Sequence, residues 1–314
     1  MKLEDVTSLG PNSATITAEG QLQVTGIGFI KREGEYNIVV DVDRNGMFDP
    51  AIDRIDRTGI DLSIEPLQGS TLYFPQIADG RFREVGFRTT LYLVAAEGGG
   101  ELQIEFLGSD GLPMELTLGD LGTSSSFTIK LQTGESVSLE TAGSGELKTG
   151  YARIIGVRGV NGTAILTRTD TATATVLYEA GVPATTPLTD FSIVVDSIGA
   201  KDTGLAIVNA RKPGEPGALP QATIQLRLYD QNFRLIQQKE LNLSPGEHRA
   251  RFISELFPET AQTAREMLGV LSVASNEPVA VVTLRLRDDP ALKFPEDVPN
   301  LTTFPVIPGR PDEE

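Results

Sequence analysis

The chain contains no cysteine, which removes several classes of chemistry at once. Without thiols there is no disulfide bond, no thiolate nucleophile and no cysteine-ligated metal site. Histidine is nearly absent as well, because His248 is the only one in 314 residues. A Ser-His-Asp triad could therefore be built only around His248, and a zinc site would need nearly all its ligands from carboxylates.

Basic residues and long apolar runs are also scarce. Lysine and arginine number 27 against 43 acidic residues, which gives a formal net charge of -16, and no segment gathers them into a patch. Such a surface repels phosphate backbones, so we expect no nucleic-acid partner. No apolar stretch approaches the roughly 20 residues that cross a bilayer, so we expect no membrane span. The opening MKLEDVTSLG lacks the basic and then apolar pattern of a signal peptide, and none is expected in this chain. A mature or recombinant chain would have lost such a segment, so secretion stays open.

What the sequence does have is the composition of an all-β protein. It contains 32 Gly and 19 Pro, with many Thr, Val and Ile and few helix-favouring runs. Residues 13–30 (SATITAEGQLQVTGIGFI) and 35–43 (EYNIVVDVD) alternate in short bursts, as expected for strands. We predict a small β unit over residues 1–70, with SIEPLQG at 63–69 as its exit linker.

From Tyr73 onward the chain repeats itself, with an offset of 112 to 122 residues. The matched segments keep their order along the sequence. They are TTLYLV (89–94) with TGLAIV (203–208), LQIEF (102–106) with IQLRL (224–228), KLQTGE (130–135) with NLSPGE (242–247), GYARI (150–154) with GVLSV (269–273), and TAILTR (163–168) with VAVVTLR (279–285).

Two units of this size, each with about seven short alternating strands, predict tandem immunoglobulin-like β-sandwiches preceded by the small β unit. We place the first sandwich at 71–188, the second at 189–308 and a mobile acidic tail at 309–314. The second copy differs by an extra loop, ARKPGEPGALPQ at 210–221, and by a predicted short helix, PETAQTAREML at 258–268.

A resemblance to a known family rests on three motifs in the repeated part of the chain. FPQIADG at 74–80 followed by TTLYLV, together with TGLAIVN at 203–209, resembles the repeated immunoglobulin-like β-sandwich modules of bacterial secreted and cell-surface proteins. The resemblance covers residues 72–308, and its motifs are short and mostly structural. It implies an extracellular or cell-surface setting rather than an activity. The first copy departs from the motif, with Ala95 where the second has Asn209.

An aspartate-rich loop follows the strand-like run at 38–40 and resembles an EF-hand-like calcium loop. Ca²⁺ prefers six to eight oxygen ligands, which a tight turn supplies from Asp or Asn at alternating positions and a Gly at the sixth. The predicted calcium ligands are Asp41, Asp43, Asn45, the backbone carbonyl of Met47, Asp49 and Asp53.

The loop departs from the EF-hand in its second half. Position 12 is Ile52 rather than Glu, so Asp53 or Asp56 would have to close the shell, and the loop is entered from a strand rather than a helix. The pattern is closer to the calcium loops of extracellular β proteins. The alternative is a solvated turn, since Asp and Asn favour turns and Asn-Gly is a strong hairpin signal.

The catalytic interpretations find little support in the sequence. His248 lies in SPGEHRARF, which aligns with a turn of the first copy, and no G-x-S-x-G nucleophile elbow occurs. We predict a turn or strand-edge residue rather than a catalytic base, and a protein that is not an enzyme. DTG at 202–204 lacks the second aspartate of an aspartic protease, because its repeat partner at 88–90 reads RTT.

Sugar binding is harder to separate from a structural role. Carbohydrate platforms use flat aromatic faces, and the chain has no Trp and only 6 Tyr. Tyr73, Tyr92, Tyr151 and Tyr178 are candidates, with cross-strand packing as the alternative for each. Phe257 is expected to fill the core rather than contact a ligand.

The sequence thus predicts a non-catalytic extracellular structural or adhesion protein stabilised by Ca²⁺. Its partners would be other proteins or copies of itself, and assembly into a surface layer or filament by strand addition is one form this could take. The alternative is a carbohydrate-binding or accessory module of a secreted hydrolase system, with a glycan as partner.

Overall fold

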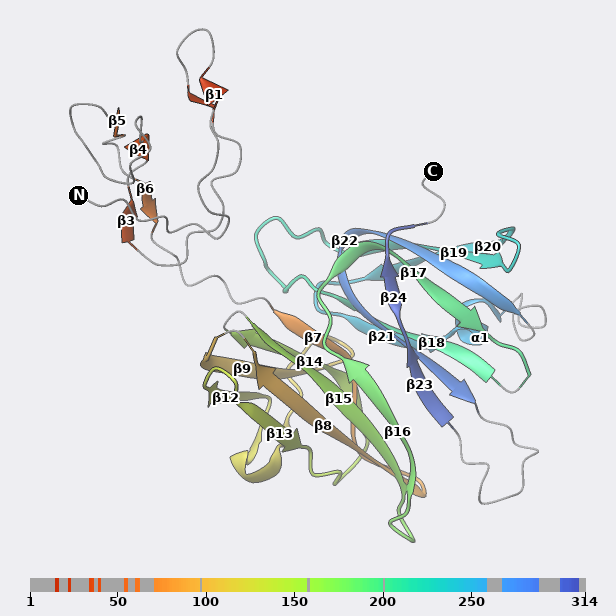
Figure 1. Cartoon of the computed structure of the whole chain (residues 1–314). Helices are drawn as coiled ribbons and strands as arrows, with labels where there is room; N and C mark the ends of the chain where they lie inside the picture. The colour runs from red at the N-terminus through yellow and green to blue at the C-terminus, as the bar shows by residue number, and fades with distance from the viewer. Residues whose placement is uncertain are drawn as a thin grey trace. The chain divides into compact units, whose positions relative to one another are not determined.

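The computed structural model describes residues 71–310, apart from 97, 157–158, 200, 259–266 and 288–299, and six short strands nearer the N-terminus. Within these residues nearly all regular structure is β-strand (Figure 1). The exceptions are the 3-10 helix η1 (Gly119–Leu121) and the single-turn helix α1 (Ile253–Leu256). The predicted all-β class is confirmed. No helix in the described part of the chain is long and apolar enough to cross a membrane.

The chain divides into two compact units, Met1–Leu67 and Gln68–Glu314. Three short antiparallel pairs are described in the first unit. They are β1 (Thr15–Ile16) with β2 (Leu22–Gln23), β3 (Gly34–Tyr36) with β6 (Ile60–Leu62), and β4 (Val39–Val40) with β5 (Arg54–Ile55). The β4–β5 pair lies between β3 and β6 in the sequence, so the last two pairs are nested.

The first β-sandwich, at the start of the second unit, consists of two four-stranded antiparallel sheets. Their strand orders are β12-β9-β14-β7 and β13-β8-β15-β16, and the ends of β7 and β8 also pair. The strands are β7 (Leu72–Phe82), β8 (Val85–Ala95), β9 (Gly100–Gly108), β12 (Ser126–Leu131), β13 (Ser136–Glu140), β14 (Lys148–Gly156), β15 (Val160–Asp170) and β16 (Val176–Pro183). A small pair, β10 (Leu116–Thr117) with β11 (Thr123–Ser124), flanks η1.

The second β-sandwich repeats this plan with one long strand, β22, shared by both sheets. The orders are β20-β19-β22-β17-β24 and β21-β18-β22-β23. The N-terminal half of β22 pairs with β17 and β19, and its C-terminal half pairs with β18 and β23. The strands are β17 (Leu188–Asp196), β18 (Lys201–Asn209), β19 (Ala222–Asp230), β20 (Leu235–Leu243), β21 (His248–Phe252), β22 (Leu268–Arg287), β23 (Asn300–Phe304) and β24 (Val306–Pro308).

The two sandwiches therefore have equivalent strand pairings, with β14 and β15 of the first corresponding to the two halves of β22 in the second. The matched turns agree in detail. In the first, the Gln132 N–H donates to the Glu135 carboxylate (2.8 Å) and the Glu135 N–H donates back to the Gln132 carbonyl (2.9 Å). Ser244 and Glu247 make the same two bonds in the second, each at 2.9 Å. The KLQTGE and NLSPGE segments thus encode one turn used twice.

The differences predicted for the second copy are found only in part. The extra loop at 210–221 lies between the end of β18 and the start of β19. Asn209 stabilises its base, because its side chain donates to the Leu243 carbonyl (3.0 Å) and accepts from the Arg211 N–H (3.1 Å). The helix predicted at 258–268 falls mostly outside the described residues, and its last residue, Leu268, begins β22. Of the tail, Gly309 and Arg310 bind Asp190, and the rest lies outside the described residues.

Alternating side chains fill the core of each sandwich. In β9, Leu102, Ile104 and Phe106 are fully buried, whereas the alternating residues Glu101 and Gln103 are exposed, as expected for a strand with one face on a core. The second sandwich has its own apolar cluster, which includes Phe191, Leu226 and the fully buried Phe257. Phe257 is a core residue, as predicted.

One sheet of the second sandwich is covered on both faces. In β18, Leu205 and Ile207 belong to the core of their own sandwich, whereas Ala206 belongs to the core of the first. The same alternation holds in β22, where Val281 faces its own core and Val282 faces the first sandwich. A sheet buried on both faces needs apolar residues at consecutive positions, which explains the unbroken runs GLAIV and PVAVVTL.

We call the contact between the two sandwiches the seam. Its centre is an apolar cluster with residues from both copies, namely Tyr73, Leu107, Tyr151, Val208 and Ala280. Two tyrosine hydroxyls cross it: Tyr73 Oη donates to the Ala210 carbonyl and Tyr151 Oη to the Gly246 carbonyl, each at 3.0 Å. The two sandwiches therefore pack against each other through a shared interface and are not independent modules.

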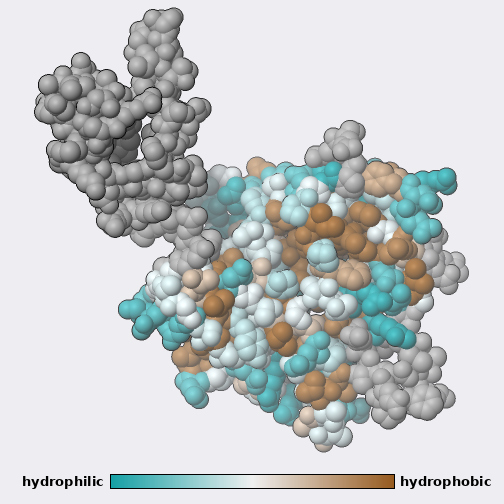
Figure 2. Space-filling view, in the orientation of Figure 1, coloured by the Kyte–Doolittle hydropathy of each residue, from teal (hydrophilic) through white to brown (hydrophobic). Residues whose placement is uncertain are grey.

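Hydrophobic side chains also reach the surface of the second sandwich. Figure 2 shows them gathered over the region of β17 and β24, with hydrophilic residues around them. β24 is the last strand of its sheet, and its Ile307 is 49% exposed. Among the described residues no further strand pairs with β24, so this edge combines an unpaired side with apolar surface.

Candidate functional site

The predicted calcium ligands, Asp41, Asp43, Asn45, Met47, Asp49 and Asp53, lie outside the described residues. The strands on either side of them are described. Val39 pairs with Ile55 and Val40 with Arg54, so the predicted loop begins and ends at the base of an antiparallel hairpin. This agrees with entry from a strand and leaves calcium binding a prediction. Within the described part of the chain, no group of three or more acidic or histidine side chains could hold a metal ion.

His248 is the first residue of β21 and lies at the seam, where it is only 4% exposed. It follows the Ser244–Glu247 turn directly, as the sequence predicted, but its burial comes from the other sandwich. Ser109, just after β9, contacts it twice: its carbonyl accepts from the His248 N–H (3.0 Å) and its hydroxyl lies 3.2 Å from Nδ1. The ring of Tyr151 lies beside the imidazole, with centroids 6.1 Å apart.

Burial dominates the electrostatics of the seam. It lowers the pKa of His248 to about 4, because the charged imidazolium would lose its hydration, while the nearby Pro75 carbonyl opposes the shift. Burial likewise raises the pKa of the Tyr73 and Tyr151 hydroxyls. At neutral pH all three side chains are therefore uncharged, which suits a packed interface.

A serine beside the only histidine raises the question of a catalytic triad. In a triad the histidine uses one ring nitrogen on the serine and the other on a carboxylate that orients it. Here Nδ1 of His248 lies against the Ser109 hydroxyl, and no carboxylate of the described residues forms a hydrogen bond with Nε2. The two acids of the cavity are engaged elsewhere: Asp110 accepts the Leu112 N–H, and Glu247 binds Ser244 and Arg249.

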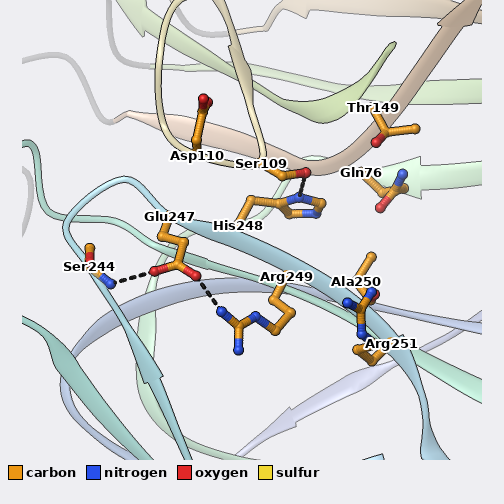
Figure 3. A pocket seen from close by; sticks show the side chains of 10 residues that line it. All are labelled: Gln76, Ser109, Asp110, Thr149, Ser244, Glu247, His248, Arg249, Ala250 and Arg251. Carbon is orange, nitrogen blue, oxygen red and sulfur yellow. Dashed lines mark hydrogen bonds and ion pairs between the residues drawn. The ribbon is translucent and has the colours of Figure 1, made fainter. Parts of the chain in front are cut away.

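Figure 3 shows this arrangement in the cavity of about 630 Å³ that His248 lines. The Glu247 carboxylate points toward Ser244 and Arg249, and the Asp110 side chain points away from the imidazole. The described geometry brings a hydroxyl and an imidazole together without the acid that a general base needs. The pair can hold the two sandwiches together, and its chemistry is that of a hydrogen bond across an interface.

Of the four tyrosines considered for sugar binding, one is at the surface. Tyr73 and Tyr151 are buried in the seam, and Tyr178 lies under the Arg168 guanidinium. Tyr92 is 48% exposed on the outer face of β8, in a cleft of about 700 Å³. Thr90 and Thr167 line the same cleft, as does Arg88, which is paired with Glu140 at 3.0 Å.

Sequence reasoning missed a third cavity, of about 260 Å³, between the two sandwiches. Its walls are mostly apolar and it is lined by Arg168, a charged residue in TAILTRTD. The signal was present in that segment, because Ala164, Leu166 and Arg168 share one face of the strand and an arginine interrupts an otherwise buried row.

Comparison with known proteins identified no relative of the chain. No family model, curated protein or solved structure matches the chain. The function must therefore be argued from the geometry of the chain itself.

Proposed function

We propose that the chain is a non-catalytic structural or adhesion protein of the extracellular space or bacterial cell surface, with a calcium-stabilised N-terminal loop. The observation that carries this proposal is the seam. Its polar side chains, Tyr73, Tyr151 and His248, form hydrogen bonds between the two sandwiches. The only histidine is buried in the contact between the two sandwiches, and this contact holds them together. Such an arrangement suits a protein that bears mechanical load or displays binding surfaces.

Open sheet edges support association with protein partners or with further copies. The two outer strands of one sheet of the second sandwich differ in character. The β20 edge carries Lys239 and Glu240, and charges of this kind discourage strand pairing. Both edges expose an aliphatic side chain, Leu235 on β20 and Ile307 on β24, but β24 carries no charged residue and lies beside the hydrophobic patch, which favours it as the acceptor of an added strand.

The proposed donor is the N-terminal segment 13–24 of another copy. Part of this segment already forms the β1–β2 pair, so donation would exchange two short internal pairings for a longer intermolecular one. Size-exclusion chromatography with light scattering, over a range of concentrations, tests the assembly. Ile307→Lys should lower the association constant at least tenfold, whereas Leu235→Lys on β20 should leave it unchanged. A chain that stays monomeric at every concentration, with and without calcium, overturns self-assembly.

The calcium loop is tested separately by thermal unfolding in Ca²⁺ and in EGTA. A ligand that binds only the folded state stabilises it by about 2.7 kcal/mol at a hundredfold excess over its dissociation constant. Asp41→Ala and Asp43→Ala should abolish the calcium-dependent rise, and Asp120→Ala, an exposed aspartate in η1, should retain it. Identical curves for the wild type in the two buffers remove the metal from the proposal.

A carbohydrate-binding or accessory role is the second candidate, and Tyr92 favours it. A half-exposed aromatic ring in a cleft with threonine hydroxyls and a guanidinium offers the stacking and hydrogen bonds that sugars use. Saturable binding on a glycan array that is lost in Tyr92→Ala, and kept in Phe233→Ala, would replace the structural proposal by this one. Tyr151→Ala is no surface probe, because Tyr151 is buried in the seam.

A further inference from the structure

Arg168 occupies a position that its strand reserves for apolar residues. On β15, Ala164 and Leu166 point into the core of the first sandwich, and Arg168 continues the same face at the end of the row. Its strand neighbours in register are Phe87 on β8 and Tyr178 on β16. The guanidinium carbon lies 5.9 Å and 5.5 Å from the centres of these two rings. The three side chains form a row with the cation between two aromatic faces.

The two rings hold the guanidinium without neutralising it. Cation–π contacts stabilise the charge, but they leave the five N–H donors of an arginine in need of acceptors. Among the described residues Arg168 forms no ion pair, and its buried Nε has no hydrogen-bond partner. This is unusual in a chain with 43 acidic residues and 27 basic ones. A half-buried cation that pairs with none of the described carboxylates is available to bind an anionic ligand.

The cavity beside Arg168 has the complementary character. It measures about 260 Å³, it is partly open to solvent, and most of its lining consists of apolar side chains from both sandwiches. Its other polar side chains include Arg251 and Gln76, whose Oε1 is also buried without a partner. The acid in its lining, Glu255, is engaged in capping α1 by accepting the Phe252 N–H at 2.8 Å. The apolar wall includes Leu147, Leu166, Leu205, Leu284, Leu286 and Leu301.

We propose that this seam cavity binds a small amphipathic carboxylate, such as a short-chain fatty acid. The carboxylate would accept two N–H bonds from Arg168, a fork geometry for which arginine is suited, with Arg251 adding positive charge. The hydrocarbon chain would lie along the leucines of the two sandwiches. This site goes beyond the proposed structural role, since it adds a ligand that bridges the two halves of the body.

The charge of the protein and the walls of the cavity restrict the ligand further. A net charge of -16 repels small hydrophilic anions, so acetate or phosphate would have to bind against the overall field with nothing to gain from the apolar walls. A neutral alcohol of the same length would bury the same chain but would leave the guanidinium short of a counter-charge. Only a ligand with both features satisfies the whole cavity.

Calorimetric titration of the full chain with octanoate, octanol and acetate tests the inference. Octanoate should bind saturably, octanol at least tenfold more weakly, and acetate not measurably. Arg168→Met keeps an unbranched side chain between the rings and removes the charge, and it should weaken octanoate binding at least tenfold. Arg88→Met is the matched control, because Arg88 lies on the outer face of the neighbouring strand and is paired with Glu140. It should bind octanoate as the wild type does.

Two results overturn the proposal. One is equal affinity for octanoate and octanol in the wild type, and the other is unchanged octanoate binding in folded Arg168→Met. Circular dichroism and the melting temperature establish folding for each variant. If Arg168→Met does not fold, Ala250→Leu provides the second test, because Ala250 lines the cavity and a larger side chain there should block octanoate. Unimpaired binding by folded Ala250→Leu contradicts the site.

Discussion

At the scale of single residues, two buried threonines act as equivalent clamps in the two sandwiches. The Thr89 hydroxyl accepts from the Ala78 N–H (3.0 Å) and donates to the Ala78 carbonyl (2.8 Å). Thr203 makes the same pair of bonds to Asp196, at 2.9 and 3.3 Å. Each hydroxyl therefore satisfies both backbone groups of one residue, Ala78 in β7 or Asp196 at the end of β17.

Thr89→Val should destabilise the chain by about 1–3 kcal/mol, because the isosteric valine leaves two buried backbone groups without a partner. Thr203→Val should cost a similar amount. Urea unfolding followed by circular dichroism measures both. Thr128→Val, at an exposed position on β12, should stay within about 0.5 kcal/mol of the wild type. Equal stability of all four proteins would contradict the clamp.

His248 should make the free energy of unfolding depend on pH. Its pKa is about 4 in the folded chain and about 6.5 in an unfolded one, so between these values the unfolded state binds more protons. The contribution of the neutral His248 to the free energy of unfolding is therefore fully present above pH 6.5 and is lost as the pH falls toward 4. The expected loss from this residue is about 3 kcal/mol.

Comparison with His248→Gln isolates this contribution from that of the carboxylates. Urea midpoints measured from pH 7.5 to pH 4 should fall more steeply in the wild type, so the gap between the two proteins should narrow on acidification. Parallel curves would mean that the imidazole is hydrated in the folded state, contrary to its burial at the seam.

At the scale of strands, two equivalent glycines allow neighbouring strands to approach. A Cβ on Gly150 would lie 2.0 Å from the Leu107 carbonyl oxygen, and one on Gly269 would lie 2.2 Å from that of Tyr229. The repeat matched these positions through GYARI and GVLSV. Both glycines are thus required by the spacing between paired strands, β14 with β9 and β22 with β19.

Gly150→Ala and Gly269→Ala should each destabilise the chain by about 1–3 kcal/mol or more, because the strands must move apart to accept a methyl group. Gly181→Ala on β16 is the control, since its nearest neighbour would be 3.8 Å away. Chemical denaturation at equal protein concentration gives the comparison. A Gly150→Ala protein as stable as Gly181→Ala would show that the strands have room to adjust.

The strands and turns could be predicted from the sequence because their signals are local. Alternation located β9 and β19, and the KLQTGE and NLSPGE segments located a turn that both copies form. The single strand β22 could not be predicted in this way. Asn276 and Pro278 read as a turn, yet the strand runs through them as it passes from one sheet to the other.

Long-range pairing also changed one sequence match. Leu91 and Leu205 are equivalent residues of the two copies. Leu91 pairs with Ala164 and Leu205 pairs with Thr283, so the structure makes Ala164 equivalent to Thr283. Aligning the first residues of TAILTR and VAVVTLR instead matches Ala164 with Ala280, three residues earlier. Sequence similarity among alternating apolar residues tolerates such a slip, whereas hydrogen-bond register does not. The immunoglobulin-like family and the calcium loop stay predictions.

At the scale of the whole molecule, the repeat suggested two sandwiches, but nothing local indicated that one would bury a sheet face of the other. Tyr73, Tyr151 and His248 lie far apart in the sequence and meet only through this packing. The candidate sites follow the same rule. Tyr92 and Arg168 acquire their character from the cleft and the cavity in which the fold places them, which no alternation pattern specifies.

The seam should make the two sandwiches unfold together. Val282, 2% exposed, belongs to a strand of the second sandwich but packs in the core of the first, so Val282→Glu places a charge in the contact between the two. It should cost more than about 3 kcal/mol, and hydrogen exchange should show amides of β9 and β19 losing protection together. Gln238→Glu adds the same charge at an exposed site of β20 and should do neither. Loss of protection in β19 alone would mean that the sandwiches are energetically independent despite their contact.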